Sequence, residues 1–143
     1  MLLSILGPLE IQFLFGLFLS VGLGYIIGAE RESRGKDAGI STHILVISGA
    51  MLFTLLSVGD GTNYDTRIAA QIVSGIGFLG AGLILKEGST IKNLTTAASI
   101  WCAGALGMTI GFGFYVVALF AGILFMLVPR IPHIRDKNQE ADS

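Results

Sequence analysis

Four long stretches without a charged side chain constrain the fold of this chain more than any other feature. They cover residues 11–29, 38–59, 68–85 and 93–129. A helix rises about 1.5 Å per residue and the hydrocarbon core of a bilayer is about 30 Å thick, so each stretch approaches or exceeds one membrane span. Only 13% of the residues are charged, about half the usual share in soluble domains. The sequence therefore predicts an integral membrane protein made of helices.

The last uncharged stretch is too long for a single span, because residues 93–129 would form about 55 Å of helix. The segment GMTIGFG at 107–113 contains three glycines and predicts a tight hairpin there. We therefore expect an all-α bundle of five transmembrane helices, of which the fourth is short for a span. The predicted helices cover residues 10–29, 42–58, 67–85, 94–108 and 112–128. Residues 1–129 form the predicted transmembrane domain, and residues 130–143 form a short polar tail.

The basic residues predict an orientation. Eight of the nine Lys and Arg residues fall in the first connection, the third connection or the tail, and only Arg67 lies near the second connection. Cytoplasmic loops of membrane proteins carry an excess of Lys and Arg. We therefore expect the N-terminus outside and the C-terminus in the cytoplasm. A four-helix count would place the basic tail on the opposite side.

Small residues recur every four positions along two of the predicted helices. The first ridge is Gly16, Ser20, Gly24 and Gly28, and the second is Thr95, Ser99, Ala103 and Gly107. Lipid provides little hydrophobic drive between helices, and small residues let their backbones approach closely. Both ridges are therefore predicted to mediate helix packing. The first is expected to face a second copy of the chain in a homodimer or larger homo-oligomer.

Gly75, Gly77 and Gly80 have the G-x-G-x-x-G spacing of a dinucleotide-binding loop. That motif functions where a strand turns into a helix, with an acidic residue about 20 positions later. No Asp or Glu lies between Gly88 and Gly107, and the glycines fall within an uncharged run. We therefore predict that they serve membrane-helix packing.

An internal repeat is a second interpretation of the glycine pattern. A shift of 53 residues aligns GLGYIIGAER, from Gly22, with GIGFLGAGLI, from Gly75, and Thr42 with Thr95. This predicts a parallel repeat in which the first two helices match the third and fourth. The alternative is chance similarity between glycine-rich segments.

Polar residues on the predicted cytoplasmic side suggest two roles. Thr42 and Thr95 follow the two basic connections and are expected to cap helix starts. The alternative is an anion or proton site built from Glu30, Arg31 and His43, since histidine changes charge near neutral pH.

A second polar group, formed by Asp65, Arg67 and Gln71, begins the third predicted helix on the outer side. Polar residues at membrane depth mark either a pathway or a structural pair. The structural interpretation is that Arg67 lies at the interface and pairs with Asp60 or Asp65. Cys102 shares a face with Thr95 and is expected to be an inert packing residue.

Catalysis has little support in the sequence. No Ser or Cys has a plausible nearby base, and the two histidines lie far apart, so we predict no enzyme, no metal site and no cofactor. The net charge of −1 argues against a nucleic-acid partner. The predicted partners are the lipid bilayer and other membrane proteins.

Several motifs occur in the order typical of a known family. They are GAERE at 28–32, THILVISGAMLF at 42–53, RIAAQIVSGIGFLGAG at 67–82 and LTTAASIW at 94–101. Together they resemble the membrane domain of the MgtC/SapB family over most of residues 13–128. The resemblance implies a multi-pass protein of the bacterial inner membrane, connected with magnesium homeostasis, acid stress and virulence. Some family members are thought to act on the F-type ATP synthase.

The resemblance also implies which residues matter. By motif these are Glu30, Arg31, Glu32, Thr42, His43, Arg67, Gln71, Thr95, Thr96 and Cys102. Longer family members continue into a soluble domain, whereas this sequence stops after its tail, so we expect function to reside in the bundle and its connections.

Two functional hypotheses follow. The first is a non-enzymatic regulator that binds another membrane protein through small-residue helix faces, because the predicted spans hold no carboxylate apart from Glu10 at an edge. The second is a small transporter or channel with a polar site lined by Arg67, Gln71, Thr95 and Cys102.

Overall fold

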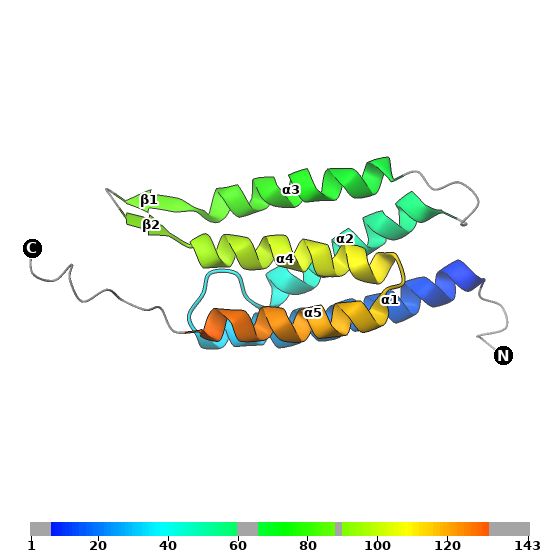
Figure 1. Cartoon of the computed structure of the whole chain (residues 1–143), viewed down its shortest axis with the longest axis horizontal. Helices are drawn as coiled ribbons and strands as arrows, with labels where there is room; N and C mark the ends of the chain where they lie inside the picture. The colour runs from blue at the N-terminus through cyan, green and yellow to red at the C-terminus, as the bar shows by residue number, and fades with distance from the viewer. Residues whose placement is uncertain (1–6, 60–65, 88–89, 132–143) are drawn as a thin grey trace, which may run out of the picture.

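The computed structural model of the chain describes residues 7–59, 66–87 and 90–131, and within these residues five α-helices form one bundle (Figure 1). The helices are α1 (Pro8–Ser33), α2 (Ile40–Val58), α3 (Arg67–Leu83), α4 (Leu94–Gly111) and α5 (Tyr115–Leu127). A hairpin of β1 (Leu85–Glu87) and β2 (Thr90–Lys92) joins α3 to α4, and the 3-10 helix η2 (Val128–Arg130) follows α5. The expected bundle of five helices is confirmed.

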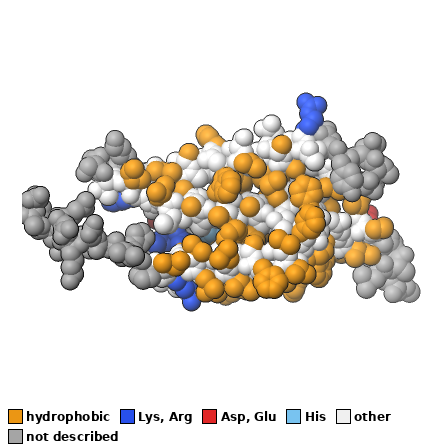
Figure 2. Space-filling view, viewed as in Figure 1, with side chains coloured by type: hydrophobic (Ala, Val, Ile, Leu, Met, Phe, Trp, Pro, Cys, Tyr) orange, Lys and Arg blue, Asp and Glu red, His pale blue; other side chains and the backbone are white. Residues whose placement is uncertain are grey.

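The surface of the bundle suits a lipid environment. Among the described helices, α1, α2 and α4 are long and apolar enough to cross a membrane, while α3 and α5 are shorter apolar helices. Large apolar side chains face outwards, and Phe18 and Phe78 are 81% and 80% exposed. Figure 2 shows apolar side chains covering the middle of the bundle. The predicted number of five membrane spans remains a prediction, because only three of the described helices are long and apolar enough to be identified as spans.

The predicted break between the fourth and fifth helices was placed too early. Gly107 and Gly111 lie inside α4, and only Gly113 has the positive φ, 82°, of a tight turn. A Cβ on Gly107 would collide with the backbone of Ile47 in α2, so this glycine allows two helices to pack closely. Helix α4 is therefore longer than predicted, with 18 residues, and α5, with 13 residues, is the shortest of the described α-helices.

The first ridge packs inside the protomer, which corrects its expected role in dimerisation. Gly16, Ser20, Gly24 and Gly28 are all buried. A Cβ on Gly24 would stand 2.7 Å from the Cα of Ile44, and one on Gly28 would meet the backbone of Ile40. The ridge therefore packs α1 against α2, so it is not available to a second copy. Its predicted role in helix packing is confirmed.

The second ridge is divided between core and surface. Ala103 and Gly107 are buried, and Gly107 packs against α2. Ser99 is half-buried and Thr95 is exposed, and both line a groove on the surface of the bundle. Helix α2 therefore lies at the centre of the bundle, in contact with α1, α3 and α4.

Within the described protomer, only one glycine of the G-x-G-x-x-G segment packs against another helix. A Cβ on Gly80 would make ordinary contact with Ala97 of α4, at 3.5 Å from its carbonyl oxygen. No atom lies within 4 Å of a Cβ built on Gly75 or Gly77, so their predicted packing role has no contact within the described protomer and stays a prediction. They face away from the α3–α4 contact.

The predicted repeat has mixed support. Helices α2 and α4 end at Val58 and Gly111, which are 53 residues apart. The packing differs, because Gly24 contacts α2 closely while its counterpart Gly77 has open space around it. The third helix also ends at Leu83, since Leu85–Glu87 pairs with Thr90–Lys92 in the hairpin. The repeat stays a prediction.

Positive charge gathers at one end of the bundle. The end of α1, the start of α2, the hairpin, the start of α4 and the end of α5 all lie there (Figure 1). We call it the basic end, because these segments carry Arg31, Arg34, Lys36, Lys92 and Arg130. Arg67 begins α3 at the opposite end. This distribution agrees with the charge pattern behind the predicted orientation, which stays a prediction.

Candidate functional site

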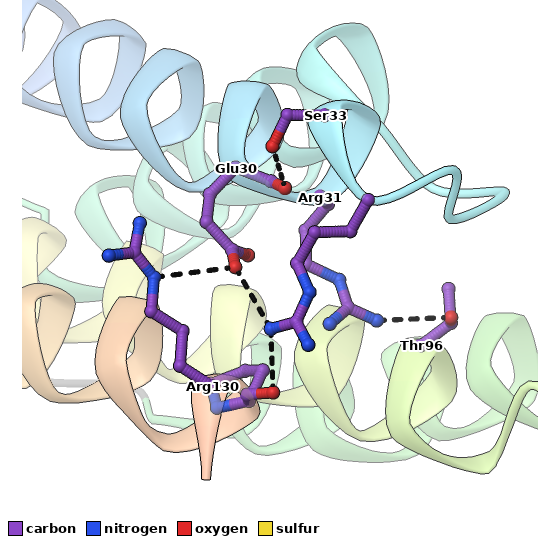
Figure 3. Close-up of polar contacts among 7 residues, drawn as sticks. Glu30, Arg31, Ser33, Thr96 and Arg130 are labelled. Atoms are coloured by element: carbon purple, nitrogen blue, oxygen red, sulfur yellow. Dashed lines mark hydrogen bonds and ion pairs between the residues drawn. The ribbon is translucent and has the colours of Figure 1, made fainter. Parts of the chain in front are cut away.

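The last turns of α1 place two charged side chains inside the basic end. Arg31 is 1% exposed and Glu30 is 8% exposed, although both belong to a residue class that rarely enters a protein interior without a partner. Buried charge is costly unless it is paired and hydrogen-bonded. The contacts of these two residues therefore define the candidate site (Figure 3).

Arg31 contacts the start of α4. Its Nη2 donates a hydrogen bond to Oγ1 of Thr96, at 3.1 Å, and the Thr96 side chain is fully buried. Its Nε is also buried and has no hydrogen-bond partner among the described residues. The motif residues Arg31 and Thr96, 65 positions apart in the sequence, are thus in direct contact.

Glu30 is held by two arginines from different segments. Its Oε1 accepts a hydrogen bond from Nη1 of Arg34, at 3.2 Å, and lies 3.6 Å from Nε of Arg130 in η2. Arg34 also donates to the carbonyl of Pro129, at 2.7 Å, and the Ser33 hydroxyl donates to the Glu30 carbonyl. In Figure 3, the Arg130 side chain approaches Glu30 from the side opposite Arg31.

His43 lies buried in the first turn of α2. Its Nδ1 donates to the carbonyl of Gly39, at 2.8 Å, while its Nε2 has no hydrogen-bond partner among the described residues. It interacts electrostatically with Arg31 and Glu30. The structure therefore brings together the three residues that the sequence suggested for an anion or proton site.

The predicted threonine caps are wrong. Helix α2 begins after Gly39, two residues before Thr42, and α4 begins after Asn93, so Thr95 lies inside its helix. Oε1 of Glu32 accepts the backbone N–H of Ile40, at 3.0 Å, and thus satisfies a free donor at the start of α2. Glu32 therefore has a structural role that the sequence did not indicate.

The outer polar group does not join the site. Asp65 lies outside the described residues, and Arg67 and Gln71 are exposed on the first turns of α3. Because α3 and α4 run in opposite directions, Thr95 lies at the basic end, far from Arg67 (Figure 1). The sequence analysis predicted one transport site lined by four side chains: Arg67, Gln71, Thr95 and Cys102. This prediction is wrong, because the four side chains do not lie together.

Thr95 and Cys102 instead share a groove at the basic end. It has a volume of about 650 Å³ and is lined by α4, by the end of α5 with η2, and by basic residues near the end of α1. Ser99 also lines it, so the predicted common face of α4 is confirmed. Cys102 is half-buried and free.

Two residues of the site were not among the predicted functional residues. Arg34 follows Glu30 by one helical turn, and this spacing, which favours an ion pair, was a signal that could have identified it. Arg130 lies 100 residues after Glu30, and the sequence indicated only that it follows the last apolar run.

The site has the chemistry of an anion-binding cluster. Arg31, Arg34 and Arg130 line one groove, and among the described residues Arg34 and Arg130 share the single carboxylate of Glu30, so the cluster has excess positive charge. Divalent cations prefer several oxygen ligands with negative charge. Within the described part of the chain, no group of three His, Cys, Asp or Glu side chains is placed to hold a metal ion.

Comparison with known proteins gives consistent matches. A model of the MgtC family matches residues 17–133. The chain is 44% identical over 118 residues to "Protein MgtC" of Salmonella typhimurium strain LT2, covering 82% of this chain and 51% of that protein. It is 40% identical over 131 residues to "Putative magnesium transporter YhiD" of Escherichia coli K12, covering 85% and 61%.

An uncharacterized protein of Synechocystis is 48% identical over 121 residues, covering 82% of this chain and 50% of the relative. The chain spans about half the length of the first curated relatives that it matches. No solved structure matches it.

Proposed function

Because the chain belongs to the MgtC family, we propose that it is a non-enzymatic regulator in the bacterial inner membrane, active in adaptation to low magnesium or acid stress. In this proposal it is a multi-pass protein, and it acts by binding a transmembrane helix of another membrane protein, such as the F-type ATP synthase. The observation that carries the proposal is an apolar groove between α2 and α3, the α2–α3 groove.

The α2–α3 groove has a volume of about 500 Å³ and opens on the side of the bundle. Its lining is apolar apart from Gln71, and it includes Gly49, Phe53, Ile68, Gly75 and Leu79. It runs along the middle of α2, from Leu45 to Phe53, and along α3 from its first turn, at Ile68, to Leu79.

Gly49 and Gly75 make this groove suitable for a helix. No atom lies within 4 Å of a Cβ built on either glycine, so the groove floor is open backbone. Helices associate in lipid where small residues allow close backbone contact. The glycines of the α1 ridge and Gly107 of the α4 ridge are already used within the protomer, whereas Gly49 and Gly75 remain accessible from the lipid side.

The test fills the groove without disturbing the fold. Gly75→Leu places a side chain into open space, and Gly22→Leu makes the same change on the exposed face of α1, where a Cβ also meets nothing within 4 Å. Wild type and both variants are co-reconstituted with purified F-type ATP synthase, and ATP-driven proton pumping is measured.

We expect wild type and Gly22→Leu to change pumping equally, and Gly75→Leu to lose the effect. An unchanged pumping rate with wild-type protein would refute this partner. Equal effects of all three forms on pumping would refute the α2–α3 groove as the binding site. A Gly49→Cys variant that crosslinks to a second copy of the chain would show that the occupant is another protomer.

Transport is the second candidate, favoured by the name of the Escherichia coli relative. The ion pairs of Glu30 argue against a cation path at the basic end, because the buried carboxylate of this residue is engaged by two arginines. Mg²⁺ influx into proteoliposomes distinguishes the candidates. Mg²⁺ flux with wild-type protein that is absent from protein-free liposomes would support transport, and no flux would refute it.

A further inference from the structure

The groove at the basic end, which we call the α4–α5 groove, combines a basic rim with an apolar wall. Four basic residues line the rim: Arg31, Arg34, Lys36 and Arg130. The volume of about 650 Å³ falls in the range of small-molecule binding sites. Among the described residues, Glu30 carries the one carboxylate that pairs with Arg34 and Arg130, so the rim has a net positive charge.

The apolar wall continues onto the outer surface of the bundle. Leu124, Val128 and Ile131 line the groove and are 54%, 49% and 67% exposed. In a membrane these side chains would contact lipid tails, since they belong to the apolar belt around α5. A ligand in this groove therefore meets positive charge at one end and hydrocarbon at the other.

Arg31 is the feature that points to a ligand. It is the most deeply buried charged residue described, it lines the groove, and its Nε lacks a hydrogen-bond partner within the described residues. Its side-chain hydrogen-bond partner among the described residues, Thr96, is uncharged. A guanidinium group in such a place favours an anion that offers several acceptor oxygens, as phosphate does.

We propose that the α4–α5 groove binds an anionic phospholipid, with its phosphate at the basic rim and its acyl chains along the wall formed by α5 and η2. Basic pockets between transmembrane helices are suited to anionic lipid headgroups. A free phosphate ion would use the rim only, and the exposed apolar wall would have no role. The proposal rests on the membrane location of the chain and is independent of the partner proposed above.

The experiment measures lipid binding by the purified full chain in detergent. Native mass spectrometry records occupancy by phosphatidylglycerol and, separately, by phosphatidylcholine of equal chain length. Inorganic phosphate serves as the competing free anion. Lys36→Gln removes one charge from the rim at an exposed position, and Lys92→Gln removes one charge from the same end outside the groove.

We expect wild-type protein to prefer phosphatidylglycerol, and Lys36→Gln to weaken that binding about fivefold, because one basic residue near an anionic headgroup contributes roughly that factor. Lys92→Gln should bind as wild type does. Ala98→Trp places a bulky side chain in the groove and leaves all charges unchanged, and it should prevent lipid binding.

Three outcomes would overturn the proposal. Equal occupancy by the two lipids would show that the rim does not select an anion. Equal losses in Lys36→Gln and Lys92→Gln would show that only the overall charge matters. Displacement of the lipid by millimolar inorganic phosphate would show that the site binds the free anion.

Discussion

Replacing Gly107 by Ala tests the close packing of α2 and α4, on which the centre of the bundle depends. A Cβ at this position would stand 2.7 Å from the Cβ of Ala50 and 2.9 Å from the backbone nitrogen of Met51. Ordinary van der Waals contact lies at 3.4–4 Å, so the two helices must separate by about 1 Å to accept one methyl group. The contacting atoms are largely backbone, which cannot rotate away as the end of a side chain can.

The expected free energy combines two opposing effects. Overpacking a well-packed core costs about 1–3 kcal/mol. Replacing Gly by Ala in a helix interior returns up to about 1 kcal/mol through helix propensity. We therefore expect Gly107→Ala to lower the free energy of unfolding by about 1–2 kcal/mol. Gly22→Ala, where a Cβ meets nothing within 4 Å, should be neutral or slightly stabilising.

Unfolding in mixed micelles of mild detergent and sodium dodecyl sulfate, followed by far-UV circular dichroism, measures both variants. Gly111→Ala provides an independent repeat, since its Cβ would meet Thr54 and Met51 of the same neighbour at 2.6–2.7 Å. The reasoning would be refuted if Gly107→Ala and Gly22→Ala had the same stability, because the difference between them isolates the α2–α4 contact.

Three further predictions concern the buried polar side chains. Thr96→Val should destabilise the fold by roughly 1.5–3 kcal/mol, because it removes the acceptor of the buried Arg31 guanidinium, whereas Thr96→Ser should cost less; chemical unfolding of both variants checks this. Glu30→Gln should lower the unfolding midpoint, since it leaves two arginines without their carboxylate, and 0.5 M salt should narrow its difference from wild type. In a Cys102→Ser background, Ser20→Cys should react with a membrane-permeant maleimide far more slowly than Val21→Cys, because Ser20 is fully buried. Ser20→Cys should also fail to crosslink between two copies of the chain, even if native mass analysis finds the predicted homo-oligomer.

Features repeated along the sequence were predictable. Charge-free runs located all five helices, because a helix at membrane depth must satisfy its own backbone and present apolar side chains to lipid. Gly24 and Gly28 were correctly assigned to helix packing, since their four-residue spacing forms a ridge on one face. The charge imbalance between connections similarly marked the basic end.

Features that depend on which faces meet were not predictable. Gly80 contacts α4 while Gly75 does not, although both belong to one motif, because the rotation of α3 about its axis is fixed by its neighbours. Gly107 was assigned both to a packing ridge and to a turn, since glycine serves turns and close packing equally well and only the position of α2 distinguishes the two. The cap on α2 comes from Glu32, eight residues before its partner, so the adjacent Thr42 was a misleading signal.

The ion pairs at the basic end also hold α5 in place, and this affects how variants of the site are interpreted. Near its start, α5 contacts α1 through Tyr115 and Phe15, whose ring centres are 4.8 Å apart. At its far end, the contacts are those of Arg34 with Pro129 and of Glu30 with Arg130. Any change to these charged residues therefore alters both the electrostatics of the α4–α5 groove and the position of its apolar wall. Loss of function in Glu30→Gln or Arg34→Gln would not by itself distinguish a ligand contact from a displaced helix. Lys36 lines the groove without joining these contacts, so the comparison of Lys36→Gln with Lys92→Gln separates ligand binding from the attachment of α5.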